Sequence, residues 1–191
     1  MIRWSRQASA IAAVAIAVCL AGCSSGVIFN SGPLGGQGST GINCAPVNGR
    51  GGVVSYGTIE FANSSASPVF ITKVSLADPR GLRMLAAYVV PVTGDSISGF
   101  VQGYPSAKRM PSGELWSERQ RADGATIEHS RGQDVTNLIA VLKPARNPGW
   151  ARGINIYYHS SNGQQYLLRQ GLQILVAINR CPDNTARYER N

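Results

Sequence analysis

Apolar and polar positions alternate in short runs through most of the chain, a pattern typical of β-strands. β-branched and aromatic residues are frequent in these runs, and Gly, Pro, Asn and Ser separate them. The predicted strands occupy residues 53–61, 69–76, 82–92, 135–142, 154–158, 165–168 and 172–178.

Strict alternation within two of these runs predicts which side chains enter a core. In residues 69–76 the predicted core face carries Phe70, Val74 and Leu76. In residues 82–92 it carries Leu82, Met84, Ala86, Tyr88 and Val90.

About seven short strands favour an all-β fold, a single immunoglobulin-like β-sandwich over residues 42–191. A small β-barrel is the alternative. The sequence Ser161-Asn162-Gly163 separates two runs, and an Asn-Gly pair predicts a hairpin with a type I′ turn. The Cys–Trp–Cys framework of antibody domains is absent.

The first residues have the three parts of a secretory signal. Arg3 and Arg6 supply positive charge, residues 10–20 are apolar, and Ala21 and Gly22 are small. The apolar run is shorter than the roughly 20 residues that span a bilayer comfortably. A retained short membrane anchor is the alternative interpretation.

The sequence Leu20-Ala21-Gly22-Cys23 resembles the lipobox of bacterial lipoproteins. The resemblance implies that the Cys23 thiol receives a diacylglycerol group, that residues 1–22 are removed and that the new N-terminus is acylated. Arg3 and Arg6 are not adjacent, so ordinary Sec export is expected. As a whole, the mature chain resembles uncharacterised exported lipoproteins of actinobacteria, a resemblance that implies no catalytic residues.

Residues 23–41 are rich in Gly and Ser and show no strand or helix period, which predicts a flexible tether after the lipidated cysteine. Val27-Ile28-Phe29 interrupts this stretch. These three residues either form an apolar patch that inserts into the membrane interface or have no function of their own. The sequence favours the second interpretation.

Four cysteines are encoded. Cys19 leaves with the signal peptide and Cys23 carries lipid, so Cys44 and Cys181 remain as a pair in an oxidising compartment. We expect a disulfide worth about 4–5 kcal/mol in the chain-entropy model. Two free buried thiols are the alternative, and neither cysteine has the neighbours of a zinc site.

Charge points to anionic partners. The chain has 18 basic and 10 acidic residues, and loss of Arg3 and Arg6 leaves 16 − 10 = +6. A basic exported protein suits anionic envelope surfaces. No nucleic-acid partner is expected, because the chain is exported and has no nucleic-acid motif.

The segment Thr93–Gly124 is the longest stretch without a strand pattern, and long loops in compact domains are often functional. Its cations and aromatics suit an envelope protein or an anionic polymer. The candidate partner-binding residues are Tyr104, Lys108, Arg109, Trp116, Arg119 and Arg121. The alternative is a solvated loop with Trp116 packed on the sandwich.

Catalytic signals are weak. His129 has Ser130, Asp123 and Asp134 nearby in sequence, yet no G-x-S-x-G elbow accompanies them. The two histidines, His129 and His159, lie far apart in sequence, so no metal site and no cofactor is expected. Acidic residues for glycoside chemistry are present but occur in charged loops.

Three functions therefore follow from the sequence. The first is a non-catalytic binding or adaptor module, lipid-anchored outside the cell membrane. The second is a carrier of a small apolar ligand or lipid in a cavity between sheets. The third and least favoured is a hydrolase.

We expect the Cys23→Ala variant to stay uncut and to incorporate no labelled fatty acid, because the thiol is the acceptor of the diacylglycerol. Metabolic labelling with a palmitate analogue, followed by mass measurement of the chain, tests this. The matched control is Cys19→Ala, which should be labelled and processed normally. Labelling of Cys23→Ala at the wild-type level would refute the anchor.

Overall fold

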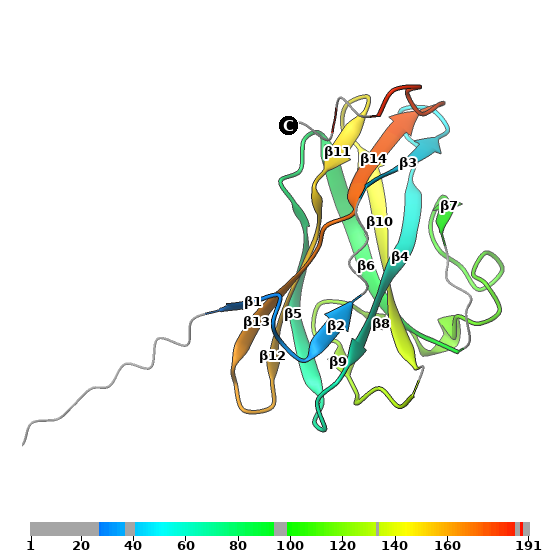
Figure 1. The fold of residues 1–191 in the computed structure, drawn as a ribbon. Helices are drawn as coiled ribbons and strands as arrows, with labels where there is room; N and C mark the ends of the chain where they lie inside the picture. Colours follow the sequence, from blue (N-terminus) through cyan, green and yellow to red (C-terminus); the bar gives the residue numbers. More distant parts are fainter. Residues whose placement is uncertain (1–26, 37–40, 94–98, 133, 186–187, 189–191) are drawn as a thin grey trace, which may run out of the picture.

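The computed structural model describes residues 27–36, 41–93, 99–132, 134–185 and 188 (Figure 1). The predicted signal peptide and Cys23 lie outside these residues. Strands dominate the described ranges, as the all-β prediction requires, and the helical element among them is the short 3-10 helix η1 (Trp116–Glu118). The described residues contain no helix with the length and apolar character needed to cross a membrane.

Two large sheets and one small sheet make up the body (Figure 1). The five-stranded sheet has the order β1 (Ile28–Phe29), β13 (Gln165–Gln170), β12 (Gly153–Ser160), β5 (Val69–Ala77), β9 (Thr126–Ile127). The six-stranded sheet has the order β2 (Leu34–Gly36), β4 (Val54–Asn63), β10 (Val135–Pro144), β6 (Leu82–Val92), β8 (Gln120–Arg121), and β7 (Phe100–Gln102) also pairs with β4. The three-stranded sheet has the order β11 (Gly149–Ala151), β14 (Gln173–Ile178), β3 (Ile42–Val47).

Every strand predicted from the sequence is present. They correspond to β4, β5, β6, β10, β12, β13 and β14. The prediction of about seven strands is too low, because the described residues also form β1, β2, β3, β7, β8, β9 and β11. Most of these additional strands have two or three residues, too few for an alternating pattern to stand out in the sequence.

One apolar core lies between the two large sheets. Ile71 and Ile156 come from the five-stranded sheet, and Phe61 and Leu138 from the six-stranded sheet. Each of these four side chains is at most 1% exposed. Successive side chains on a strand point to opposite faces of the sheet, so every second residue of each strand faces the other sheet and fills the core.

Two β-bulges change which side chains reach this core. In the pairing of β6 with β10, Ala86 lies opposite Val141 and Met84 opposite Leu142, so Leu85 is the extra residue. The alternation shifts by one position there, so Ala87 and Val89 enter the core between the sheets, while Val90 is buried on the other face of β6. The predicted core position of Tyr88 is therefore wrong, and its ring faces outward onto Trp116.

The same effect occurs on β5. Tyr158 lies opposite Ile71 and Tyr157 opposite Lys73, which leaves Thr72 as the extra residue. Val74 and Leu76 point inward as predicted. Phe70 does not: its ring stacks on His159 at a centroid distance of 5.1 Å.

The predicted hairpin joins β12 to β13, but its turn differs from type I′. Gly163 has φ +84°, whereas Asn162 does not have positive φ. Ser160 closes the loop by donating its N–H to Gln164 O at 3.1 Å, and Gln164 donates its own N–H to Asn162 Oδ1 at 3.1 Å. Asn162 thus stabilises the turn through its side chain, and Gly163 supplies the left-handed conformation.

Cys44 and Cys181 form a disulfide with a Cα–Cα distance of 6.0 Å, the pairing that the sequence predicts. Cys44 lies on β3, which pairs in parallel with β14, and Cys181 follows β14 after a short turn. The bond closes a sequence separation of 137 residues. It therefore fastens the first strand of the small sheet to the end of the chain.

Within the stretch predicted as a flexible tether, residues 23–41, the described residues include two short strands, β1 and β2. Ile28 and Phe29 pair in parallel with β13, and residues 34–36 pair with β4. Leu34 is 2% exposed, and its N–H donates to the Tyr158 hydroxyl at 3.2 Å. A large part of the Gly-rich stretch is therefore folded onto the body.

We expect the Cys44→Ala/Cys181→Ala double variant to lose about 4–5 kcal/mol of unfolding free energy, because a long loop in the unfolded chain is no longer closed. Urea unfolding followed by tryptophan fluorescence measures the change. Wild-type protein treated with reductant is the matched control and should behave like the double variant. Equal midpoints for the double variant and the oxidised wild type would contradict the role of the bond.

Candidate functional site

The loop predicted to bind a partner runs along the six-stranded sheet. Its described part contains β7, η1 and β8, and β8 pairs with β6 at Tyr88 and Val89. Main-chain bonds hold the segment before η1 to the end of β6, since Leu115 donates its N–H to Pro91 O at 3.0 Å and Thr93 donates to Gly113 O at 2.8 Å. These contacts fix the loop to the sheet at several points.

A buried carboxylate also holds the loop in place. Glu114 is 5% exposed, and its Oε1 accepts a hydrogen bond at 2.6 Å from the amide of Asn137 on β10. The same amide donates to Gly57 O at 2.9 Å. Leu138, the next residue, enters the core between the sheets, so Asn137 lies on the other face of β10, under the loop. Glu114 thus links the loop to the centre of the sheet.

Beside this point, four side chains form what we call the arginine–aromatic cluster: Tyr88, Trp116, Arg119 and Arg121. The Tyr88 and Trp116 rings meet edge to face at 5.5 Å. The Arg119 guanidinium lies 4.7 Å from the Trp116 ring centroid, and that of Arg121 lies 5.3 Å from the Tyr88 centroid. Both arginines are exposed, so their charges remain available to a partner while the rings orient them.

The other three predicted residues form a separate group near β7. Arg109 Nη1 donates to the main-chain oxygen of Gln102, and Tyr104 is 57% exposed. Lys108 is exposed beside them in sequence. The structure gives no contact between these three residues and the arginine–aromatic cluster among the described residues. The six predicted residues therefore form two surfaces rather than one.

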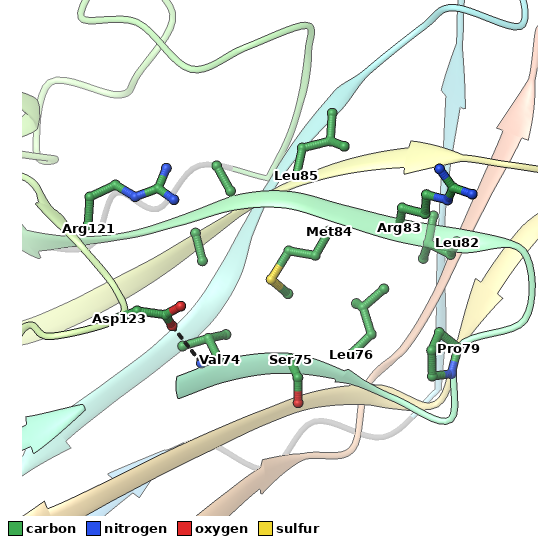
Figure 2. Close-up of a pocket in the computed structure, with 12 residues that line it drawn as sticks. Val74, Ser75, Leu76, Pro79, Leu82, Arg83, Met84, Leu85, Arg121 and Asp123 are labelled. Atoms are coloured by element: carbon green, nitrogen blue, oxygen red, sulfur yellow. Dashed lines mark hydrogen bonds between the residues drawn. The ribbon is translucent and has the colours of Figure 1, made fainter. Parts of the chain in front are cut away.

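A groove of about 480 Å³ opens between the edges of the two large sheets, next to the cluster (Figure 2). Strand β6 forms one wall and β5 the other, and the Met84 and Leu76 side chains point into the gap between them. The turn from β5 to β6, with Pro79, closes one end. We call this feature the β5–β6 groove.

The opposite end of the groove is closed by residues 122–125, which cross from one sheet to the other. Ala122 donates its N–H to Ala87 O of β6 at 3.0 Å, and Gly124 donates to Ile71 O of β5 at 2.9 Å. Asp123 Oδ1 accepts the Val74 N–H at 2.8 Å. Strand β8 pairs with β6, and β9 pairs with β5, only on the far side of this crossing. Along the groove itself, the facing edges of β5 and β6 are therefore not covered by these strands.

Polar side chains lie at the ends of this apolar groove. Arg121 and Asp123 line one end, and Arg83 lines the wall near the other. Arg121 therefore belongs to both the groove and the arginine–aromatic cluster. The arrangement can hold an apolar group between the sheets and place an anionic group against Arg121.

Sequence analysis missed Tyr88, Met84 and Leu76 as site residues. The alternating pattern placed all three in the core. The bulge at Leu85 turns Tyr88 outward, whereas Met84 and Leu76 do pack against the core but lie at its open edge, where they line the groove. The sequence suggested Asp123 only as a possible catalytic residue, such as the acidic member of a triad with His129. Its hydrogen bond to Val74 gives it a structural role at the end of the groove.

The candidate triad residues make contacts of another kind. His129 Nδ1 lies 2.7 Å from the main-chain oxygen of Ser65. The Ser130 hydroxyl accepts the Asn63 N–H at 2.9 Å. Neither contact is the nucleophile–base hydrogen bond of a hydrolase. Within the part of the chain that the structure describes, no three His, Cys, Asp or Glu residues gather in a way that could hold a metal ion.

Comparison with known proteins identifies no family. The chain matches no family of known sequences and no curated protein. Among solved structures it is similar to the ASH/PapD-like domain of human CEP192 (PapD-like domain 7), with 12% sequence identity and a TM-score of 0.38 over 95% of this chain and 99% of that chain. What the fold and the site define is an all-β domain with a groove between sheet edges and a cationic–aromatic cluster beside it.

We expect Glu114→Ala to loosen the loop and to lower the unfolding free energy by about 1–3 kcal/mol, because the Asn137 amide loses a buried acceptor. Trypsin should then cleave faster after Lys108 and Arg109, as measured by limited proteolysis with mass spectrometry. Glu118→Ala, an exposed acid in the same loop, is the control and should leave both quantities unchanged. Equal cleavage rates in the two variants would contradict this role for Glu114.

Proposed function

We propose that the chain is an exported lipoprotein, held on the outer side of the cell membrane by lipid on Cys23, that acts as a non-catalytic binding module. Its lipobox and secretory signal support export, and the Cys44–Cys181 disulfide is compatible with an oxidising compartment. The two facing sheets support the immunoglobulin-like interpretation of the sandwich.

The observation that carries this proposal is the position of Arg121. It lines the apolar β5–β6 groove and also lies over the Tyr88 ring, which contacts the Trp116 ring of the Arg119–Trp116 pair. A partner with an apolar segment next to an acidic group would satisfy both parts of this surface. Envelope proteins and anionic envelope polymers are the partners that the positive charge of the mature chain favours.

The groove also supports a second candidate, a carrier of a small apolar ligand or lipid. Its volume of about 480 Å³ lies within the range of ligand pockets, and Val74, Leu76, Leu82 and Met84 give it an apolar lining. In this second candidate the ligand would occupy the groove, with Arg121 holding its polar end.

We expect Arg119→Glu/Arg121→Glu to lower the recovery of crosslinked partners from intact cells by at least about tenfold. The introduced carboxylates would repel the acidic group of the partner. The matched control is Lys108→Glu/Arg109→Glu, which reverses two charges on the separate surface near β7. Equal recovery in both variants would count against the cluster as the binding surface.

A groove-filling variant, Ala87→Leu or Met84→Trp, separates the two candidates. Native mass spectrometry of the protein extracted from its own membranes should show an apolar ligand in the wild type and none in these variants if the chain is a carrier. Under the leading proposal no such ligand is present in either form.

A further inference from the structure

Three consecutive apolar side chains are exposed at the start of the described chain. Val27 is 51% exposed, Ile28 38% and Phe29 50%. Single exposed apolar residues are common on protein surfaces, whereas contiguous ones mark an interaction site. We call these residues the N-terminal apolar patch.

The body holds this patch in a fixed place. Ile28 and Phe29 pair in parallel with β13, and Asn30 donates its N–H to Leu167 O at 2.8 Å. The Asn30 side chain accepts the Arg169 N–H at 2.7 Å. These bonds make β1 an edge strand of the five-stranded sheet, so the patch has a defined orientation on the body.

The residues after the patch are clamped as well. A Cβ atom on Gly32 would lie 2.1 Å from the Tyr158 hydroxyl oxygen, so only glycine lets the chain pass this close to Tyr158. Burial raises the pKa of that Tyr158 hydroxyl, with a smaller opposing effect from its bond to the Leu34 N–H. The close approach of Gly32 to Tyr158 and the Leu34–Tyr158 hydrogen bond hold the segment that presents the patch.

Cationic and aromatic side chains border the patch. The Arg169 guanidinium lies 5.4 Å from the Phe29 ring centroid. A hollow of about 490 Å³ beside Val27 is lined by Lys73, Tyr157 and Tyr166, among others. Apolar side chains bordered by tyrosines and long cations are the combination that settles at the headgroup level of a bilayer.

The position of the predicted lipid restricts what this patch can meet. Cys23 precedes Val27 by four residues, which span at most about 14 Å when fully extended. If the acyl chains on Cys23 are in the membrane, Val27 lies at its surface. The chemistry of the patch and its distance from the anchor therefore point to the same occupant.

We propose that the N-terminal apolar patch inserts into the headgroup region of the bilayer and orients the domain on the membrane. This inference rests on the proposed lipid anchor at Cys23. Acyl chains alone would hold the protein at the membrane in any rotation, whereas a second contact fixes which side of the sandwich faces the lipid.

The orientation has a consequence for the β5–β6 groove. Strand β1 begins the order of the five-stranded sheet and β2 begins that of the six-stranded sheet, while β5 and β6 lie toward the opposite edges. With β1 against the lipid, the groove lies toward the other end of each sheet's strand order, although Lys73 of β5 reaches the hollow beside Val27.

The test uses the lipidated mature chain in vesicles of phosphatidylglycerol and phosphatidylethanolamine in equal parts, with or without brominated acyl chains. Phe29→Trp and Val27→Trp report from the patch, and Leu85→Trp is the control at an exposed apolar position on β6. Subtracting the wild-type signal removes the fluorescence of Trp116 and Trp150. We expect quenching of both patch reporters to be at least about twofold stronger than that of the control.

Each outcome decides a separate statement. Equal quenching of patch and control reporters in protein that sediments with the vesicles overturns the patch and leaves the anchor intact. Protein that carries no lipid and stays in the supernatant overturns the anchor on which the inference rests. Unquenched patch reporters in protein that forms dimers in the vesicles, detected by crosslinking, overturn the inference in favour of a second copy.

Discussion

The contact between the inner faces of the two large sheets is the constraint on which the rest of the structure depends. The core side chains are shielded from water only if both sheets keep their register. Examples are Phe61, Ile71, Leu138 and Ile156. The disulfide acts from outside this core by closing the small sheet at one end. The groove lies at the open edge of this core, where Leu76 and Met84 pack against it but stay only partly buried.

Sequence patterning predicted the strands well because each long strand has one face in the core. It failed at Tyr88 and Phe70 for a specific physical reason. A single extra residue, Leu85 on β6 or Thr72 on β5, reverses the alternation for the rest of the strand. Each of the two strands that border the groove, β5 and β6, contains one of these bulges. The error at Tyr88 falls in the candidate site, whereas Phe70 stacks on His159 outside it.

The Gly-rich N-terminal stretch shows the opposite limit of prediction. Composition alone predicts a flexible tether, yet Gly32 is the residue that allows the chain to pass against Tyr158. A glycine that permits close packing and a glycine in a linker are identical in sequence. Their difference depends on a partner more than a hundred residues away, which periodicity does not reveal. The cysteine pair was predictable across a similar distance because chemistry leaves few partners for a thiol.

The two edges of the sandwich thus differ in chemistry. At the β1 edge, apolar side chains are exposed and a clamp around Tyr158 fixes them. At the β5–β6 edge, apolar side chains are recessed in a groove, and Arg121 and Arg119 are exposed beside it. A protruding apolar surface suits a fluid partner such as lipid, which conforms to it, whereas a recess with fixed charges suits a partner of defined shape. The membrane contact proposed for the β1 edge and the partner site proposed for the β5–β6 groove use different side chains, so the two proposals are compatible within one small domain.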